Sequence, residues 1–194
     1  MTVEKLGVFG GTFDPVHVAH LAAAVAARHQ LGLARVLLVV AGDPWQKHGA
    51  VMAPADARLQ MVEAAIEGVE GLEASRLEID RAGPTYSIDT IEQLTAPDRE
   101  LFLIVGADVA ARMHTWHRAD ELRALVTLGI VGRGSVGAPA EPSSPWRCEP
   151  VDLPRLDVSS TDLRRRVAAG EPVEFLVPMP AVRVLRARGL YTGT

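Results

Sequence analysis

The sequence of 194 residues places two histidines, His17 and His20, three positions apart, shortly after a glycine pair at 10–11. No Gly or Pro interrupts the chain after the first histidine until Gly32, so a helix is predicted to begin near 15–18, with both imidazoles on one face. A helix start carries unsatisfied N–H groups and a partial positive charge, and glycines let a phosphate approach the backbone. These residues predict a phosphate site in which imidazoles stabilise charge during phosphoryl or nucleotidyl transfer.

The histidine pair could also be ordinary surface residues or part of a metal site. Surface histidines would show this spacing without any function. A zinc site would need a third protein ligand, and the HExxH pattern is absent from the sequence. We therefore predict no metal ion that is bound by protein side chains alone.

A second group of anion-binding side chains lies near the far end of the chain, in VSSTDLRRR at 158–166. Ser159 or Ser160 can cap a helix that starts here, and Asp162 suits its positive first turn. Arg164 lies further along the same helix, and a guanidinium can bind two phosphate oxygens at once. The stretch predicts another anion site, and the alternative is a well-capped basic surface helix.

Two more candidates follow predicted strands. Lys47 lies in the loop 42–54, where a lysine can either reach a phosphate or simply be solvated. Asp108 comes just after Gly106 at the end of a later strand, where α/β folds hold a nucleotide's ribose or a magnesium ion. Both positions are at carboxyl ends of strands, which is where ligands bind in open α/β sheets.

Candidates for binding a ring or a polar group lie between these points. Ser87 is predicted as the N-cap of a helix, and simple capping explains it fully but explains Thr85 only in part. Trp116 is predicted either as core or as a stacking platform. Its neighbours His114 and His117 are interpreted as surface residues.

The elements that position these residues alternate between apolar strands and helices. Strands are predicted in short apolar runs at 6–9, 35–41, 72–79, 100–105, 128–131 and near 148–153. Helices are predicted from 15–18 to 31, from 159–160 onward, and over 54–68, 88–94 and 178–188, with a surface loop at 134–150. Continuous apolar strands are buried on both faces, which predicts a mainly parallel sheet flanked by helices. We expect an α/β fold in a single domain over residues 1–194.

Composition limits the partners. A net charge of −4 and an isoelectric point near 5.9 argue against a general affinity for nucleic acid or an anionic membrane. The single cysteine, Cys148, cannot form an internal disulfide, which suits a reducing cytosol. No apolar run approaches the roughly 20 residues of a membrane span, and a signal-peptide pattern is absent. A cytoplasmic protein with small-molecule partners is predicted, and self-association into a homo-oligomer is left open.

Motifs from both halves of the chain together resemble the nucleotidylyltransferase superfamily marked by an HxGH histidine pair. Within it, the chain is similar to the bacterial nicotinate-nucleotide adenylyltransferases. The resemblance is carried by GGTFDPVHVAH at 10–20, GPTYSIDT at 83–90, VGAD at 105–108 with Trp116 after it, and VSSTDLR at 158–164, which is similar to the family's ISSTxIR. These segments occur in the family's order over almost the whole chain, so their combination is highly specific.

The resemblance implies a Rossmann-like, doubly wound fold and transfer of the adenylyl group of ATP to nicotinate mononucleotide, with Mg²⁺, giving deamido-NAD and pyrophosphate in NAD biosynthesis. The acceptor phosphate would attack in line, without a covalent enzyme intermediate. Catalytic roles are implied for His17, His20, Lys47 and Arg164. ATP contacts are implied for Gly10, Gly11, Thr12, Phe13, His17, His20, Gly106, Asp108, Ser160, Thr161 and Arg164. Acceptor contacts are implied for Lys47, Thr85, Tyr86 and Trp116.

One residue departs from the family's pattern, because Ala19 stands where HxGH has glycine. A methyl group there favours the helix by about 1 kcal/mol but occupies space where ATP approaches. Two alternatives remain beside the main interpretation. One is a related adenylyl- or cytidylyltransferase with another phosphate acceptor. The other is a nucleotide-binding homologue of low activity, which Ala19 suggests.

Overall fold

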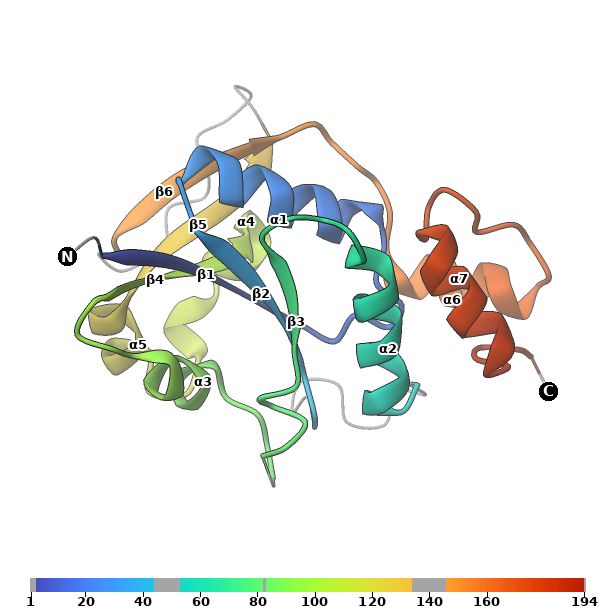
Figure 1. The fold of residues 1–194 in the computed structure, drawn as a ribbon, viewed down its shortest axis with the longest axis horizontal. Helices are drawn as coiled ribbons and strands as arrows, with labels where there is room; N and C mark the ends of the chain where they lie inside the picture. Colours follow the sequence, from blue (N-terminus) through green and yellow to red (C-terminus); the bar gives the residue numbers. More distant parts are fainter. Residues whose placement is uncertain (1–2, 44–52, 82, 134–145, 194) are drawn as a thin grey trace.

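A computed structural model of the protein describes residues 3–43, 53–81, 83–133 and 146–193. These residues form a six-stranded parallel sheet with helices on both faces (Figure 1). The strands are β1 (Glu4–Gly11), β2 (Arg35–Val40), β3 (Leu72–Ser75), β4 (Arg99–Gly106), β5 (Val126–Arg133) and β6 (Cys148–Leu153). The helices are α1 (Val18–Gln30), α2 (Ala55–Ile66), α3 (Ser87–Leu94), α4 (Ala107–Ala110), α5 (Ala119–Leu125), α6 (Ser160–Ala168) and α7 (Met179–Ala187), with a short 3₁₀ helix, η2, at Met113–Thr115.

Strand β2 shows why the sheet is covered on both sides. Its run is buried from Val36 to Val40, and alternate side chains enter two separate cores. Val36 and Leu38 pack on one face, whereas Leu37 and Val39 pack on the other, as the two-residue repeat of a strand requires. Each fully buried aliphatic side chain contributes roughly 1.5–3 kcal/mol, so such a strand is most stable with helices on both faces.

Different helices cover the two faces. Helices α1, α2, α6 and α7 pack on the core that contains Ala24, Leu163 and Val182, whereas α3, α4 and α5 pack on the core that contains Ile91 and Leu122. Figure 1 shows α6 and α7 together at the end of the molecule away from the N-terminus, with α7 beside α2. The last part of the chain therefore returns to the side where α1 and α2 begin.

The strand order is β3-β2-β1-β4-β5-β6, so the chain first winds outward from β1 and later crosses to its other side. Strands β1 and β4 are neighbours, with Leu6 opposite Leu101 and Val8 opposite Leu103. In such a doubly wound sheet the order reverses between these two strands, and a crevice opens at their carboxyl ends. The predicted α/β, Rossmann-like parallel sheet is confirmed.

The third strand is shorter than the prediction over 72–79. It ends at Ser75, because the following residues form a turn in which the N–H groups of Ile79 and Asp80 both donate to the carbonyl of Arg76. The Arg76 side chain also donates through Nε to the Asp80 carboxylate at 2.9 Å. These local bonds close the turn, so the chain leaves the sheet early.

The start of α3 also differs from the prediction. Tyr86 rather than Ser87 is the N-cap residue, and it makes no side-chain cap bond, so Ser87 lies in the first turn instead. The predicted short strand near 148–153 is confirmed as β6. Most of the loop predicted before it, residues 134–145, lies outside the described residues. None of the helices in the described ranges is long and apolar enough to cross a membrane.

Candidate active site

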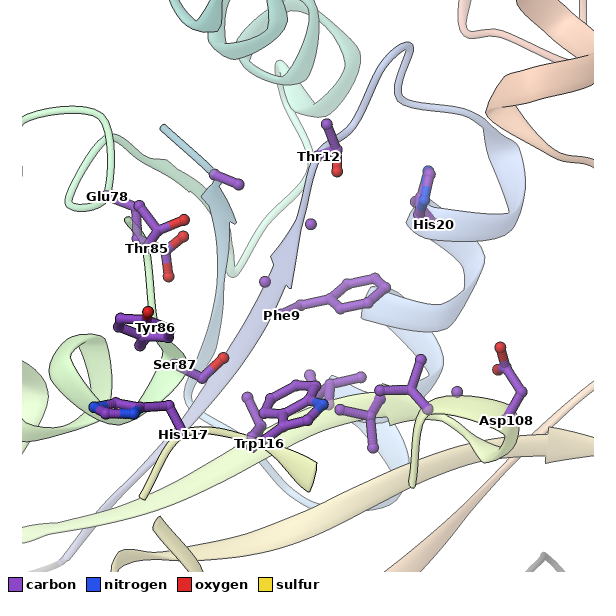
Figure 2. Close-up of a pocket in the computed structure, with 18 residues that line it drawn as sticks. Phe9, Thr12, His20, Glu78, Thr85, Tyr86, Ser87, Asp108, Trp116 and His117 are labelled. Atoms are coloured by element: carbon purple, nitrogen blue, oxygen red, sulfur yellow. The ribbon is translucent and has the colours of Figure 1, made fainter. Parts of the chain in front are cut away.

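A cavity of about 480 Å³ opens at the carboxyl ends of β1 and β4, in the crevice that the strand order creates. Figure 2 shows side chains that face it from β1, from α1, from the segment between β3 and α3, and from the segment after β4. Its lining comprises Phe9, Gly10, Gly11, Thr12, His20, Ala41, Glu78, Thr85, Tyr86, Ser87, Leu103, Ile104, Val105, Gly106, Asp108, Val109, Trp116 and His117. A volume of this size suits a small molecule that a few polar groups orient.

The glycine loop after β1 forms one wall. A Cβ on Gly11 would lie 2.8 Å from the Phe13 ring, so glycine lets this ring fold back beneath the loop. Phe13 is 2% exposed, and its ring packs edge-on against Phe9 and His20. Gly10 is different, because a Cβ there would meet no atom within 4 Å. Its missing side chain leaves space for a ligand beside the backbone.

The two histidines stack at the start of α1, with ring centroids 3.7 Å apart. His17 is the N-cap residue, and its backbone N–H donates to Nδ1 of His20 at 3.2 Å. An imidazole nitrogen that accepts carries no proton, so the proton of His20 is on Nε2. His20 lines the cavity, whereas His17 is 6% exposed and burial lowers its pKa to about 4. The pair therefore offers one imidazole to a ligand and keeps the other neutral behind it.

The far end of the chain brings a second set of groups beside the histidines. The Ser160 hydroxyl donates to the carbonyl of Pro15 at 3.0 Å, and Nη1 of Arg164 donates to the carbonyl of Asp14 at 2.8 Å. Ser159 caps α6 through its hydroxyl, which is one of the two predicted choices. The structure thus places the VSSTDLR stretch against the turn that leads into the histidine pair.

The opposite wall comes from the start of α3 and from the segment after η2. Thr85, Tyr86 and Ser87 face the cavity from the first, and Trp116 and His117 from the second (Figure 2). The rings of Tyr86 and His117 lie 4.3 Å apart. A helix start without a side-chain cap next to aromatic rings suits a flat ligand that carries an anionic group.

Two residues of this wall are not anticipated from the sequence. His117 is exposed, as expected, but it lines the cavity, and its place next to Trp116 is the signal that could have indicated this. Glu78 is 7% exposed and accepts a hydrogen bond from the Thr90 hydroxyl at 2.8 Å. Arg81 in turn donates to the same hydroxyl oxygen of Thr90. Burial raises the pKa of Glu78. It comes to the cavity only because the third strand ends early, which the sequence pattern does not reveal.

Gly106 and Asp108 line the cavity beyond β4. A Cβ on Gly106 would lie 2.8 Å from Oδ1 of Asp108, so glycine leaves room for this carboxylate to reach back over the strand end. The Asp108 side chain is exposed and lies 3.7 Å from the guanidinium of Arg112. In the part of the chain that the structure describes, no group of three His, Cys, Asp or Glu side chains is placed to hold a metal ion. One exposed carboxylate suits a ribose hydroxyl or a hydrated cation bound together with a nucleotide.

The predicted site residues fall into three groups. Those that line the cavity are Gly10, Gly11, Thr12, His20, Thr85, Tyr86, Gly106, Asp108 and Trp116. Those that do not line it are Phe13, His17, Ser160, Thr161 and Arg164; Phe13 and His17 are buried, and Ser160 and Arg164 contact the turn before α1. Lys47 lies outside the described residues. The chemical role of each residue stays a prediction.

Comparisons with known proteins give the chain a family. Residues 8–166 match the cytidylyltransferase-like family. The chain is 42% identical over 192 residues to a probable nicotinate-nucleotide adenylyltransferase of Saccharopolyspora erythraea, which covers 98% of this chain and 91% of the relative. It is 44% identical over 192 residues to one of Streptomyces coelicolor, covering 95% and 99%. The solved structure of Plasmodium falciparum nicotinic acid mononucleotide adenylyltransferase complexed with NaAD shares the fold, with a TM-score of 0.76 at 16% identity over 97% of each chain.

Sequence and geometry agree on this family. The curated relatives match almost from end to end, so the likeness is not confined to a nucleotide-binding motif. The doubly wound sheet, the cavity at its switch point and the histidine pair beside that cavity form one continuous arrangement. The chain belongs to the nicotinate-nucleotide adenylyltransferase family, within the cytidylyltransferase-like proteins.

Proposed function

We propose that this protein transfers the adenylyl group of ATP to nicotinate mononucleotide, forming deamido-NAD and pyrophosphate in NAD biosynthesis. The observation that carries the proposal is the stacked pair of His17 and His20, with His20 in a cavity whose opposite wall holds Trp116 and an uncapped helix start. Full-length relatives named for this activity support it.

The reaction needs positioning and charge stabilisation rather than a protein nucleophile. An oxygen of the acceptor phosphate bonds to the α-phosphorus of ATP while the bond to the bridging oxygen breaks, and pyrophosphate leaves with that electron pair. His20 donates from Nε2 to a phosphate oxygen as negative charge grows, and His17 fixes the His20 ring through its backbone N–H. Gly10 lets the phosphates approach the backbone, and Arg164 with Ser160 and Thr161 receives the pyrophosphate.

Mg²⁺ is proposed to enter with ATP. It would be held by one or two carboxylates together with phosphate oxygens and water, and it would neutralise charge on the triphosphate. The donor set fits, because the Asp108 carboxylate is exposed at the cavity edge beside Gly106. Asp108 would hold either this hydrated ion or the ribose of ATP.

The acceptor is proposed to bind at the opposite wall. Trp116 offers a face on which the pyridine ring can stack, and the start of α3 at Thr85 and Tyr86 suits its carboxylate. The neutral amide of nicotinamide mononucleotide would gain less from this helix start, so the acid is the preferred acceptor. Lys47 is proposed to reach the acceptor phosphate from the loop after β2.

A panel of substrates tests the proposal. Purified protein is given ATP or CTP with Mg²⁺ and one of three acceptors, namely nicotinate mononucleotide, nicotinamide mononucleotide or phosphopantetheine, and pyrophosphate release is measured. We expect rapid release only with ATP and nicotinate mononucleotide. Release with phosphopantetheine or CTP would favour the related transferases instead, and no release with any pair would favour a nucleotide-binding homologue of low activity.

The remaining expectations concern the protein in the cell. We propose that residues 1–194 form a single domain and that the protein works in the cytoplasm, which its one cysteine suits. Its proposed partners are the two nucleotides. We do not expect it to bind nucleic acid or a membrane. Light scattering after size-exclusion chromatography decides whether it forms a homo-oligomer.

A further inference from the structure

The turn between β1 and α1, residues 12–17, contains a buried carboxylate. Asp14 is 1% exposed, and its Oδ1 accepts two hydrogen bonds, from the hydroxyl of Tyr191 at 2.6 Å and from the N–H of Ala53 at 3.0 Å. Tyr191 follows α7, so a residue near the end of the sequence contacts the turn that leads into the histidine pair. We call residues 12–17 the Asp14 turn.

The second carboxylate oxygen faces a different residue. Asp14 Oδ2 is buried and receives no hydrogen bond from the described residues, but it lies 3.6 Å from Nη1 of Arg164. The same nitrogen donates to the backbone carbonyl of Asp14 at 2.8 Å. Arg164 is therefore held at the Asp14 turn both by charge and by a backbone contact.

Positive charge near Asp14 makes its burial tolerable. A buried carboxylate is costly unless cations and hydrogen bonds compensate it. Arg58 of α2, 2% exposed, donates to the carbonyl of Thr12 at 2.7 Å, and Arg164 lies on the other side. Arg164 therefore lies next to the Asp14 carboxylate, whereas Arg58 contacts the backbone of the same turn, and the orientation of the carboxylate decides which oxygen faces Arg164.

Tyr191 fixes that orientation as a donor. Burial and the adjacent Asp14 carboxylate raise the pKa of Tyr191, so the phenol keeps its proton. A protonated phenol can donate to Oδ1, which leaves Oδ2 directed toward Arg164. Other contacts from the same part of the chain reach neighbouring positions, because Ser160 donates to the Pro15 carbonyl and the Leu176 carbonyl accepts from Val18 N–H.

We propose that Tyr191 is a positioning residue for adenylyl transfer: through Asp14 it orients Arg164 and the turn that leads to His17. This inference rests on the proposed function. It assigns the C-terminal end of the chain to the triphosphate half of the site and not to the acceptor half. Loss of the hydroxyl should therefore weaken the handling of ATP and pyrophosphate while the acceptor wall is unchanged.

The test is Tyr191→Phe, which keeps the ring and removes only the hydroxyl. Binding of ATP alone is measured by calorimetry, and KM for each substrate and inhibition by pyrophosphate are measured by kinetics. We expect the Kd and KM for ATP and the inhibition constant of pyrophosphate to rise about fivefold to tenfold, which is the size of a typical net hydrogen-bond contribution, with the KM for nicotinate mononucleotide within about twofold. Thr192→Val is the matched control, since it removes an exposed hydroxyl from the next residue.

Asp14→Asn is the second variant, because it keeps an acceptor for Tyr191 and Ala53 but removes the charge that faces Arg164. It should show the same selective loss for ATP, and the double variant with Tyr191→Phe should lose less than the sum of the two effects. If Tyr191→Phe does not fold, the ATP and pyrophosphate constants of Asp14→Asn alone test the inference. Constants for ATP and pyrophosphate that stay within twofold of the wild type, or an equal rise for both substrates, would overturn the inference. ATP binding is measured without an acceptor, so an error in the proposed acceptor does not affect this result.

Discussion

The two ends of the cavity are built in different ways. At the phosphate end, arginine side chains bind backbone atoms, the buried Arg58 at Thr12 and the partly buried Arg164 at Asp14. At the acceptor end, side chains line an open wall, and the two helices beneath it are joined by Arg118, which donates to glutamates of both α3 and α5 at the surface. The helices of both ends pack on a buried core, but the side-chain bonds differ: at the first end they reach the backbone of the turn, and at the second they are surface ion pairs.

The two ends are therefore expected to have different roles. The phosphate end sets the geometry of adenylyl transfer, and the acceptor end sets the choice of acceptor. Bonds to buried backbone leave the phosphate end little freedom, as in-line transfer requires of the groups that stabilise charge. Exposed ion pairs contribute about 0–1 kcal/mol each, so the acceptor end can change its side chains at little cost to the fold. A substitution at the phosphate end should therefore alter turnover, whereas one at the acceptor end should alter the choice or affinity of the acceptor.

The largest expected effect is that of His20→Ala at the phosphate end. Removing a donor that stabilises transition-state charge costs about 10²–10³-fold in kcat. His20 lines the cavity while His17 supports it from behind, so the variant should keep its circular dichroism spectrum and lose most turnover. The matched control is His114→Ala, since His114 is exposed and does not line the cavity. Near-normal turnover in His20→Ala would mean that His20 does not stabilise the transition state.

The two ends should also respond oppositely to pH. His17 has a pKa of about 4 in the folded protein and about 6.5 when unfolded, so the unfolded chain takes up its proton first as the pH falls. The free energy of unfolding then decreases between about pH 6.5 and 4, by at most about 3 kcal/mol. Glu78 has a raised pKa when folded, so its contribution is present below about pH 4.5 and is lost as the pH rises through the folded value.

Urea unfolding at a series of pH values separates the two contributions. His17→Phe should remove much of the loss of stability on the acid side, and Glu78→Gln should remove the loss that accompanies ionisation of this carboxyl. An unchanged acid slope in His17→Phe would contradict the assignment of that slope to a buried neutral imidazole.

The next effect is expected from Trp116→Ala at the acceptor end. Stacking of a ring on an aromatic side chain contributes about 1–3 kcal/mol, so the KM for nicotinate mononucleotide should rise about tenfold or more. The KM for ATP should stay within about twofold, because the phosphate wall is built from other elements. Trp116→Phe should restore most of the affinity. A parallel rise for both substrates would remove the distinction between the two ends.

The phosphate end was the more predictable from the sequence. The residues of this end that line the cavity, from Gly10 to His20, lie in one continuous stretch, and their glycine, histidine and helix-start signals each have a direct physical meaning, so the cavity position of Gly10 and His20 follows from the prediction. Apolar runs predict the parallel sheet for the same reason, because burial on both faces leaves a continuous pattern. What the sequence could not show is which distant residues hold this end, as Tyr191 does at Asp14.

The acceptor end was less predictable because its residues come from separate elements. Glu78 reaches the cavity only through a turn closed by Arg76 and Asp80, and apolar alternation alone favoured a longer strand there. Tyr86 replaces Ser87 as the N-cap although serine is the better capping residue, since the tertiary contacts of α3 decide where the helix begins. Local turn bonds ended the strand in the first case, and packing outweighed the capping preference in the second.

The smallest expected effect concerns Ala19, where the family's HxGH pattern has glycine. Ala19 is partly exposed within α1 and is not among the residues that line the cavity, although His20 beside it is. Ala19→Gly should therefore leave the KM for ATP within about twofold, while loss of the methyl group from a helix costs about 1 kcal/mol of stability. Kinetics with ATP and urea unfolding measure the two quantities. A clear fall in KM would show instead that the methyl group crowds ATP, and that the phosphate end is less completely fixed than its buried contacts imply.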